Sequence, residues 1–238
     1  MRASVPTTPP YPYSDFAKVN MATPYFQFFT GEVPSTQDFA REHLDGLPVV
    51  VVAPGQSEGR GRTGTRWENA DESLAVSVAW RPDDSDRRPF SLIAGVAAVR
   101  VLGSDLDLKW PNDVMMDDLK VGGILVERSH GVAAAGLGLN LYWADPPAGA
   151  SGISPNPRFF SHRVLGARWA AEFLRLVDDE GWPIEEYREM CTTLGRTVVW
   201  EPNGSGIAAG INDQGALLVK TTAGVEEVHA GAVRHVRG

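Results

Sequence analysis

The chain has 238 residues, of which 43% are hydrophobic and 22% charged, so it can bury one large core and a small second one. Its 22 Lys and Arg residues against 30 Asp and Glu residues give a formal net charge of -8, which argues against a broad basic face for nucleic acid. Cys191 is the single cysteine, which excludes an internal disulfide framework and a cysteine-based zinc site.

The first elements follow in chain order. Residues 1–30 carry five prolines and several aromatic residues, a composition typical of an irregular arm. Ser35 to Asp38 precede an amphipathic pattern, which predicts a capped helix. Residues 49–53 are all apolar and predict a strand that is buried on both faces.

The rest of the chain alternates strands with two long helices, and then changes character. Strands are predicted at 74–80, 106–110, 121–127 and 133–142, and helices at 92–102 and 162–177. After Gly195, short apolar pieces alternate with turn residues, which predicts a small antiparallel barrel of about 45 residues. The sequence thus predicts an α/β protein with an arm (1–30), a main domain (31–194) and a small barrel domain (195–238).

Residues 59–67 form a loop of glycines and arginines. They read GRGRTGTRW and directly follow the buried strand and its exit turn. Glycines let the backbone approach a ligand closely, and arginines bring forked donors that suit carboxylate or phosphate. The spacing differs from both a P-loop and a dinucleotide fingerprint. We therefore predict an anion site, with a plain surface loop or an RNA-binding tract as the open alternatives.

Three later segments place polar and glycine residues at strand ends or inside strands. Residues 109–113 read KWPND and follow a predicted strand, where loops often host sites. In KVGGIL, Lys120 stands before two glycines, so it is a clamp for a phosphoryl oxygen or a solvated strand-end charge. In GLGLN, glycines lie inside an apolar strand ending at Asn140, which indicates a bulge or a ligand against the backbone.

Taken together, GRGRTGTRW, KWPND, KVGGIL and GLGLN resemble, in order and spacing, the signature of biotin protein ligases. The resemblance runs from about Ser35 through Asn140. It implies a mixed sheet flanked by helices, related to class II aminoacyl-tRNA synthetases, and a small C-terminal SH3-like barrel. It also implies an enzyme that joins biotin and ATP into biotinyl-5'-AMP and passes biotin to a lysine of a biotin carboxyl carrier protein.

The resemblance implies a role for each matching residue. Catalysis would rest on Lys120, Arg62 and Asp113. The biotin-binding set would be Ser35, Thr36, Gln37, Gln56, Arg60, Gly61, Arg62 and Lys120. The ATP and adenylate set would be Gly59, Arg60, Trp67, Lys109, Asn112, Asp113, Gly138 and Asn140. For Ser35 a plain helix cap is the alternative, and for Trp67 a core position.

Cofactors and partners follow from the same resemblance. ATP would arrive with Mg²⁺, and no metal held tightly by the protein is expected. The carrier would be the biotin carboxyl carrier domain of an acyl-CoA carboxylase, and the ligase would be a monomer or homodimer. Since no apolar segment could serve as a signal or span a bilayer, we expect a cytoplasmic protein without membrane contact.

Some features depart from the family or leave other functions open. Thr65 stands where the loop commonly has another arginine, and Gln37 stands where asparagine is commoner. The proline-rich arm is too short for the winged helix-turn-helix of the repressor-type relatives, so we expect a ligase only and no nucleic acid partner. The alternatives are a lipoate-protein ligase, which would not be expected to carry KWPND, and a non-catalytic binder of biotin or biotinyl-adenylate.

Overall fold

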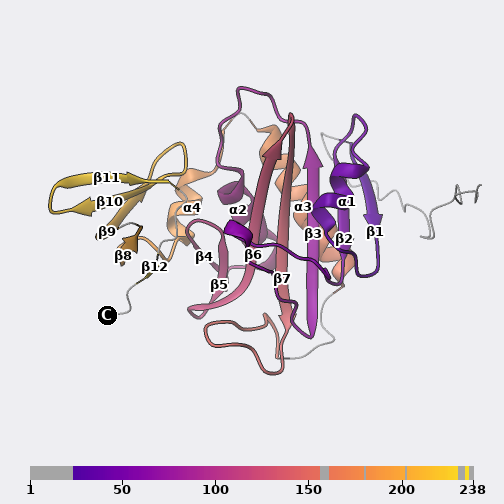
Figure 1. Cartoon of the computed structure of the whole chain (residues 1–238), viewed down its shortest axis with the longest axis horizontal. Coiled ribbons are helices and arrows are strands. Elements are labelled where there is room, and N and C mark those ends of the chain that lie inside the picture. Colours follow the sequence, from indigo (N-terminus) through magenta and orange to yellow (C-terminus); the bar gives the residue numbers. More distant parts are fainter. Residues whose placement is uncertain (1–23, 156–160, 180, 202, 230–233, 236–238) are drawn as a thin grey trace, which may run out of the picture.

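A seven-stranded mixed sheet forms the centre of the computed structural model, which describes residues 24–155, 161–179, 181–201, 203–229 and 234–235 (Figure 1). The strand order is β1-β2-β3-β7-β6-β5-β4. Only β1 pairs in parallel, and the other neighbours are antiparallel. The bounds are β1 Phe26–Phe29, β2 Val49–Ala53, β3 Glu72–Trp80, β4 Asp107–Lys109, β5 Asp113–Met116, β6 Leu119–Ser129 and β7 Val132–Tyr142.

Helices cover both faces of this sheet. Helix α1 (Thr36–Glu42) packs on one face, over Val49 and Val51 of β2. Helices α2 (Phe90–Leu102) and α3 (His162–Asp178) pack on the other face, on the side of Val50 and Val52. All residues of β2 are buried, which confirms the prediction of a strand covered on both sides.

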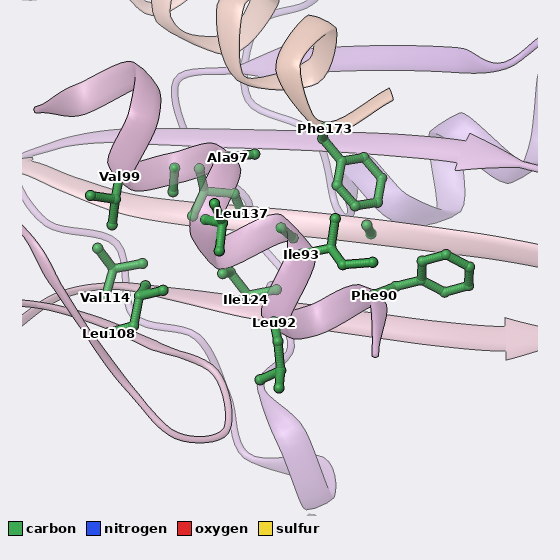
Figure 2. Close-up of a cluster of buried hydrophobic side chains, with 14 of the residues drawn as sticks. Phe90, Leu92, Ile93, Ala97, Val99, Leu108, Val114, Ile124, Leu137 and Phe173 are labelled. Carbon is green, nitrogen blue, oxygen red and sulfur yellow. The ribbon is translucent and has the colours of Figure 1, made fainter. Parts of the chain in front are cut away.

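The main core lies between the sheet and the layer of α2 and α3, where apolar side chains of helix and sheet gather (Figure 2). Phe173 of α3 is fully buried. Its ring stacks on Trp169 with centroids 5.5 Å apart and meets Trp80 of β3 edge-on at 5.2 Å. Gly166 lets α3 approach β2, because a Cβ there would lie 2.7 Å from the side chain of Val52.

We expect Phe173→Ala to lower the free energy of unfolding by about 3–5 kcal/mol, since it removes a ring from a packed aromatic cluster and leaves a cavity. Urea denaturation followed by tryptophan fluorescence measures this. Val164→Ala in the same helix is the control, because Val164 is 49% exposed. Equal midpoints for the two variants would contradict this account of the core.

Strand β1 corrects the prediction that residues up to 30 form an irregular arm. Phe26 to Phe29 pair in parallel with Val49 to Val52 of β2 and extend the sheet. The element was missed because the prolines of the same stretch dominate its composition, and because the pairing partner lies more than twenty residues later. Residues 1–23 of the arm lie outside the described residues.

The C-terminal strands form a separate antiparallel sheet beside the β4 edge, at the far end from β1 (Figure 1). Its order is β11-β10-β9-β8-β12, an antiparallel arrangement as predicted. The bounds are β8 Thr197–Trp200, β9 Gly204–Ile211, β10 Leu217–Thr221, β11 Gly224–Val228 and β12 Arg234–His235. The domain boundary at Gly195 stays a prediction.

Polar contacts join the C-terminal sheet and its β9–β10 turn to the rest of the chain. Trp110, in the turn between β4 and β5, donates its indole N–H to the Gly215 carbonyl over 2.9 Å. Trp182 donates to the Asp213 carbonyl. Arg188, on the short helix α4 (Ile184–Met190), donates to the Ile211 carbonyl.

Within the described part of the chain, no helix is long and apolar enough to cross a membrane.

Candidate functional site

A pocket of about 220 Å³ opens over the middle of the large sheet. It is bounded by the start of α1, the glycine and arginine loop, the β4–β5 turn and strands β3, β6 and β7. The structure therefore brings together segments from Ser35 to Gly138, which lie far apart in the sequence. The predicted residues that line it are Ser35, Thr36, Gln37, Gln56, Arg60, Gly61, Arg62, Trp67, Asn112, Asp113, Lys120 and Gly138.

Three predicted residues are absent from the pocket lining. Gly59 is buried under Trp67, where a Cβ would lie 3.0 Å from the Trp67 Cβ. Lys109 ends β4 and is half-buried. Asn140 is buried in β7 and donates its amide to the Ser151 carbonyl over 3.2 Å. Their assignment to a nucleotide site stays a prediction.

One end of the pocket carries a chain of neutral polar groups. The Thr36 hydroxyl donates to Gln56 Oε1 over 2.9 Å and lies 2.7 Å from the Ser77 hydroxyl. The Thr36 backbone N–H also donates to Gln56 Oε1. Asn69 holds Gln56 in place by hydrogen bonds to its backbone N–H and carbonyl. This end can exchange hydrogen bonds with a small neutral ligand group.

Ser77 is a pocket residue that the sequence alone did not indicate. It lies in the apolar run of β3 and is fully buried, yet it lines the pocket. A serine inside the otherwise apolar run 74–80 is the signal that could have found it, because a buried hydroxyl needs a partner.

We expect Thr36→Val to lower the free energy of unfolding by about 1–3 kcal/mol, because the buried Ser77 hydroxyl then loses its partner. The same substitution removes one donor from Gln56. Thermal or urea unfolding measures the change. Thr197→Val is the control, since Thr197 is an exposed strand residue. A variant as stable as the wild type would contradict the hydrogen-bond chain.

Ser35 and Gln37 fix α1 on the sheet. The Ser35 hydroxyl caps the helix by accepting a hydrogen bond from the Asp38 N–H over 3.3 Å. The Gln37 amide donates to the carbonyls of Leu125 and Ala134 over 2.9 Å each, which ties the helix to β6 and β7. Both residues also line the pocket, so the cap and a ligand contact are compatible roles for Ser35.

The opposite end of the pocket carries two cations held by polar partners. Lys120 Nζ lies 2.5 Å from Asp113 Oδ1, and the Arg62 guanidinium donates to Asn112 Oδ1 over 3.1 Å. Burial lowers the pKa of Arg62 from its ordinary value, and the nearby Asp113 carboxylate opposes that change. Arg62 stays charged at neutral pH because the ordinary pKa of an arginine lies far above 7. This end can bind an anion.

The backbone around Lys120 is held by a later loop. The Lys120 N–H donates to the Gly149 carbonyl over 2.9 Å, and the Lys120 carbonyl accepts from the Ser151 N–H over 3.0 Å. Since β5 pairs with the other edge of β6, the start of β6 has backbone partners on both sides. The Lys120 side chain extends toward the pocket from a rigid strand. A rigid strand suits a charged group that must be positioned precisely.

Trp67 lies across the pocket between the two ends. Gly123 of β6 and Gly138 of β7 face each other in register, and the indole lies against both. A Cβ at Gly138 would lie 2.8 Å from two ring carbons, and one at Gly123 would lie 3.1 Å from the ring. Lys120 Nζ lies 5.9 Å from the ring centroid. The glycines thus make room for a flat aromatic wall beside the lysine.

The two legs of the glycine and arginine loop are joined by backbone hydrogen bonds. The Gly61 N–H donates to the Thr65 carbonyl over 2.7 Å, and the Trp67 N–H donates to the Gly59 carbonyl over 2.8 Å. A Cβ at Gly61 would clash with the Thr65 hydroxyl. Thr65, one of the two residues noted as departures from the family pattern, donates its hydroxyl to the Arg62 carbonyl.

Within the described ranges, no group of three or more His, Cys, Asp or Glu side chains could hold a metal ion. Asp113 is the pocket carboxylate, and Asn112 contributes an amide oxygen. One carboxylate suits an ion that is bound mostly by phosphate oxygens and water, which is how Mg²⁺ usually accompanies a nucleotide. The residues present fit that mode of binding.

Family models match most of the main domain and the C-terminal sheet. Residues 32–141 match the biotin/lipoate A/B protein ligase family, and residues 193–236 match the biotin protein ligase C terminal domain. These two ranges contain the pocket residues and strands β8 to β12.

Similar proteins occur in several bacteria. The biotin--[acetyl-CoA-carboxylase] ligase of Mycobacterium tuberculosis is 32% identical over 217 residues, covering 82% of this chain and 80% of that protein. The ligase of the same name from Paracoccus denitrificans is 30% identical, covering 77% and 88%. The biotin protein ligase of Aquifex aeolicus, solved with biotin and ATP, has a TM-score of 0.76 at 23% identity, covering 89% and 99%. The chain therefore belongs to the biotin protein ligase family.

Proposed function

We propose that this protein joins biotin and ATP into biotinyl-5'-AMP and then transfers biotin to a lysine of a carrier protein. The observation that carries the proposal is the division of a single pocket into a neutral hydrogen-bonding end and a cationic end. Relatives that are at least 30% identical carry the name biotin--[acetyl-CoA-carboxylase] ligase. The carrier would accordingly be the biotin-accepting domain of an acyl-CoA carboxylase.

The two ends match the two ends of biotin. Its ureido ring both donates and accepts hydrogen bonds, which suits the Thr36, Gln56 and Ser77 chain. Its carboxylate would lie toward Arg62 and Lys120. The dithiolane ring of lipoate has no hydrogen-bonding group to satisfy that polar end. The pocket therefore favours biotin over lipoate.

In the first half-reaction, positive charge in the pocket offsets the negative charge of the two reactants. A carboxylate oxygen of biotin attacks the α-phosphorus of ATP, the bond to the β-phosphate oxygen breaks, and pyrophosphate leaves. Two anionic reactants must meet, so Arg62 and Lys120 would neutralise the charge on the five-coordinate phosphorus. Asp113 would hold Mg²⁺, which supplies further positive charge to the phosphates. Trp67 would exclude water from one side of the mixed anhydride.

Transfer to the carrier needs no enzyme nucleophile. The neutral ε-amine of the carrier lysine attacks the carbonyl carbon of the adenylate, an amide bond forms, AMP leaves with the electron pair of the broken bond, and the proton lost by the amine passes to solvent. The adenylate is activated already, so the protein's part is to orient it and to exclude water. We propose that the activity is cytoplasmic.

A transfer assay tests the proposal. Purified protein is given MgATP and either biotin with a biotin carboxyl carrier domain or lipoate with a lipoyl domain. We expect label on the biotin carrier only, together with pyrophosphate. Label on the lipoyl domain would identify a lipoate ligase. Binding of biotin without pyrophosphate release would identify a non-catalytic binder, and a salt-sensitive shift of RNA or DNA would revive the nucleic-acid alternative.

A further inference from the structure

Four charged side chains next to the pocket form a closed ring of ion pairs. Arg60 donates to both oxygens of Asp38, over 2.6 and 2.7 Å. It also lies 3.5 Å from Glu127. Arg41 completes the ring, at 3.3 Å from Asp38 and 3.0 Å from Glu127. Cations and anions alternate around this ring, so its formal charge is zero.

The ring joins three parts of the fold that meet at the pocket. Asp38 and Arg41 belong to α1, Glu127 belongs to β6, and Arg60 belongs to the glycine and arginine loop. Asp38 stands two residues after Thr36 on the helix that supplies the neutral end of the pocket. The loop carries Arg62, which belongs to the cationic end. The ring therefore links both ends of the pocket.

Arg60 and Arg62 of the loop differ in what they contact. Arg62 donates to the amide oxygen of Asn112, a pocket residue on the β4–β5 turn. Arg60 is bound instead by the carboxylates of Asp38 and Glu127, which lie outside the pocket lining, and its hydrogen bonds lower the pKa of the Asp38 carboxyl. A guanidinium held by two anions already has the partners that a substrate carboxylate would offer. Arg60 therefore has less to gain from biotin than Arg62 has.

Fixing Arg60 fixes the rest of the loop. The Arg60 and Arg66 backbones form an antiparallel bridge, and the Gly61 N–H donates to the Thr65 carbonyl. The segment between them, which contains Arg62, is closed by these contacts. A single anchored residue at the loop entrance thus restricts where the Arg62 side chain can reach.

We propose that the ring is a latch that holds the loop in its binding geometry, with Arg60 as a positioning residue rather than a substrate ligand. The proposal rests on the biotin-activating function argued above. Without the latch, the loop would populate its binding geometry for a fraction of the time, and apparent affinity would fall by that fraction. Chemistry after binding would change much less.

Asp38→Asn is the discriminating substitution, because it removes the charge but keeps the shape and leaves Arg60 in place. We expect the KM for biotin to rise about tenfold while kcat stays within about threefold. If Arg60 bound the biotin carboxylate instead, freeing it from Asp38 would leave the KM unchanged or lower it. That result would overturn the latch.

The matched control is Asp179→Asn. Asp179 is as exposed as Asp38 (56% against 54%) and pairs with Arg175 at 3.1 Å, far from the pocket. The control should keep the wild-type KM. Glu127→Gln provides a second variant should Asp38→Asn fold poorly, and we expect its KM to rise in the same direction. A wild-type KM in Glu127→Gln would speak against a closed ring.

A double-mutant cycle separates positioning from direct contact. We expect the KM for biotin of the double variant Asp38→Asn, Arg60→Gln to be no higher than that of the more damaging single variant. The reason is that both substitutions break the same latch. If Arg60 contacted biotin independently of Asp38, Arg60→Gln would cost far more than Asp38→Asn and the two effects would add. Additivity would therefore contradict the proposal.

Limited trypsin digestion of the substrate-free protein tests whether the ring holds the loop, without any ligase assay. Cleavage after Arg62 and Arg66, followed by mass spectrometry, should be several-fold faster in Asp38→Asn than in the wild type or Asp179→Asn. Equal rates would show that the ring does not hold the loop. A wild-type protein that forms no biotinyl-5'-AMP would refute the proposed function, while the digestion would still test the latch.

Discussion

Replacing Lys120 with alanine is expected to slow biotinyl-5'-AMP formation by on the order of 100-fold to 1,000-fold, the usual effect of removing one preorganised charge from a transition state. Lys120 lies in the pocket beside Asp113 and Trp67, on a strand whose backbone is held on both sides. Without its ammonium group, the carboxylate and the α-phosphate would meet with less neutralisation. Pyrophosphate release under saturating biotin and MgATP measures the loss.

Lys220→Ala is the control for this prediction. Lys220 is exposed on β10, in the C-terminal sheet, so its loss removes the same charge without touching the pocket. Unfolding midpoints of both variants should stay near the wild type, since Lys120 is partly exposed and its ion pair is weak in water. Wild-type turnover in Lys120→Ala would contradict the catalytic assignment.

Gly138→Ala is expected to reduce kcat/KM for biotin by about 100-fold, the cost of displacing a positioned group by roughly 1 Å. A Cβ at this position would lie 2.8 Å from two carbons of the Trp67 ring. The ring is rigid, so it would have to shift away from β7 and into the pocket. Steady-state kinetics would record the loss, and the near-ultraviolet circular dichroism of the tryptophans would record the shift.

Gly210→Ala is the matched control, because it makes the same change at a strand glycine that has room. A Cβ at Gly210 would meet only Leu218, at 3.7 Å. This variant should retain wild-type kinetics and stability. If Gly138→Ala also retained wild-type kinetics and stability, Gly138 would not be the residue that makes room for the Trp67 ring.

The elements with strong apolar patterns were predicted well. The strands at 49–53, 74–80 and 133–142 and the helices at 92–102 and 162–177 differ from the observed bounds by two residues or fewer. Such segments are buried along their length, so their hydrophobic pattern reports directly on the core. Strand β5 and helix α4 were missed because both are short, and a few residues give no clear period.

The site was predicted in part. The motifs led to Lys120, Arg62 and Asp113, and the structure brings all of these to one pocket. Ser77 was missed because a lone serine in a strand has no motif around it. The partners of Arg60 were missed as well. In the sequence, nothing distinguishes Asp38 and Glu127 from other acidic residues. Only the distances in the folded structure identify them as the partners of the Arg60 guanidinium.

The linear sequence by itself determined the buried strands and helices, the motif residues, and the family to which the chain belongs. Only the tertiary structure decided that β1 joins the sheet, that Trp67 rests on Gly123 and Gly138, and that Arg60 faces Asp38 while Arg62 faces Asn112. The physical reason is the sequence separation over which each effect acts. Periodicity and turn chemistry act between near neighbours in the sequence, whereas ion pairs and ring contacts depend on distances that the whole fold sets.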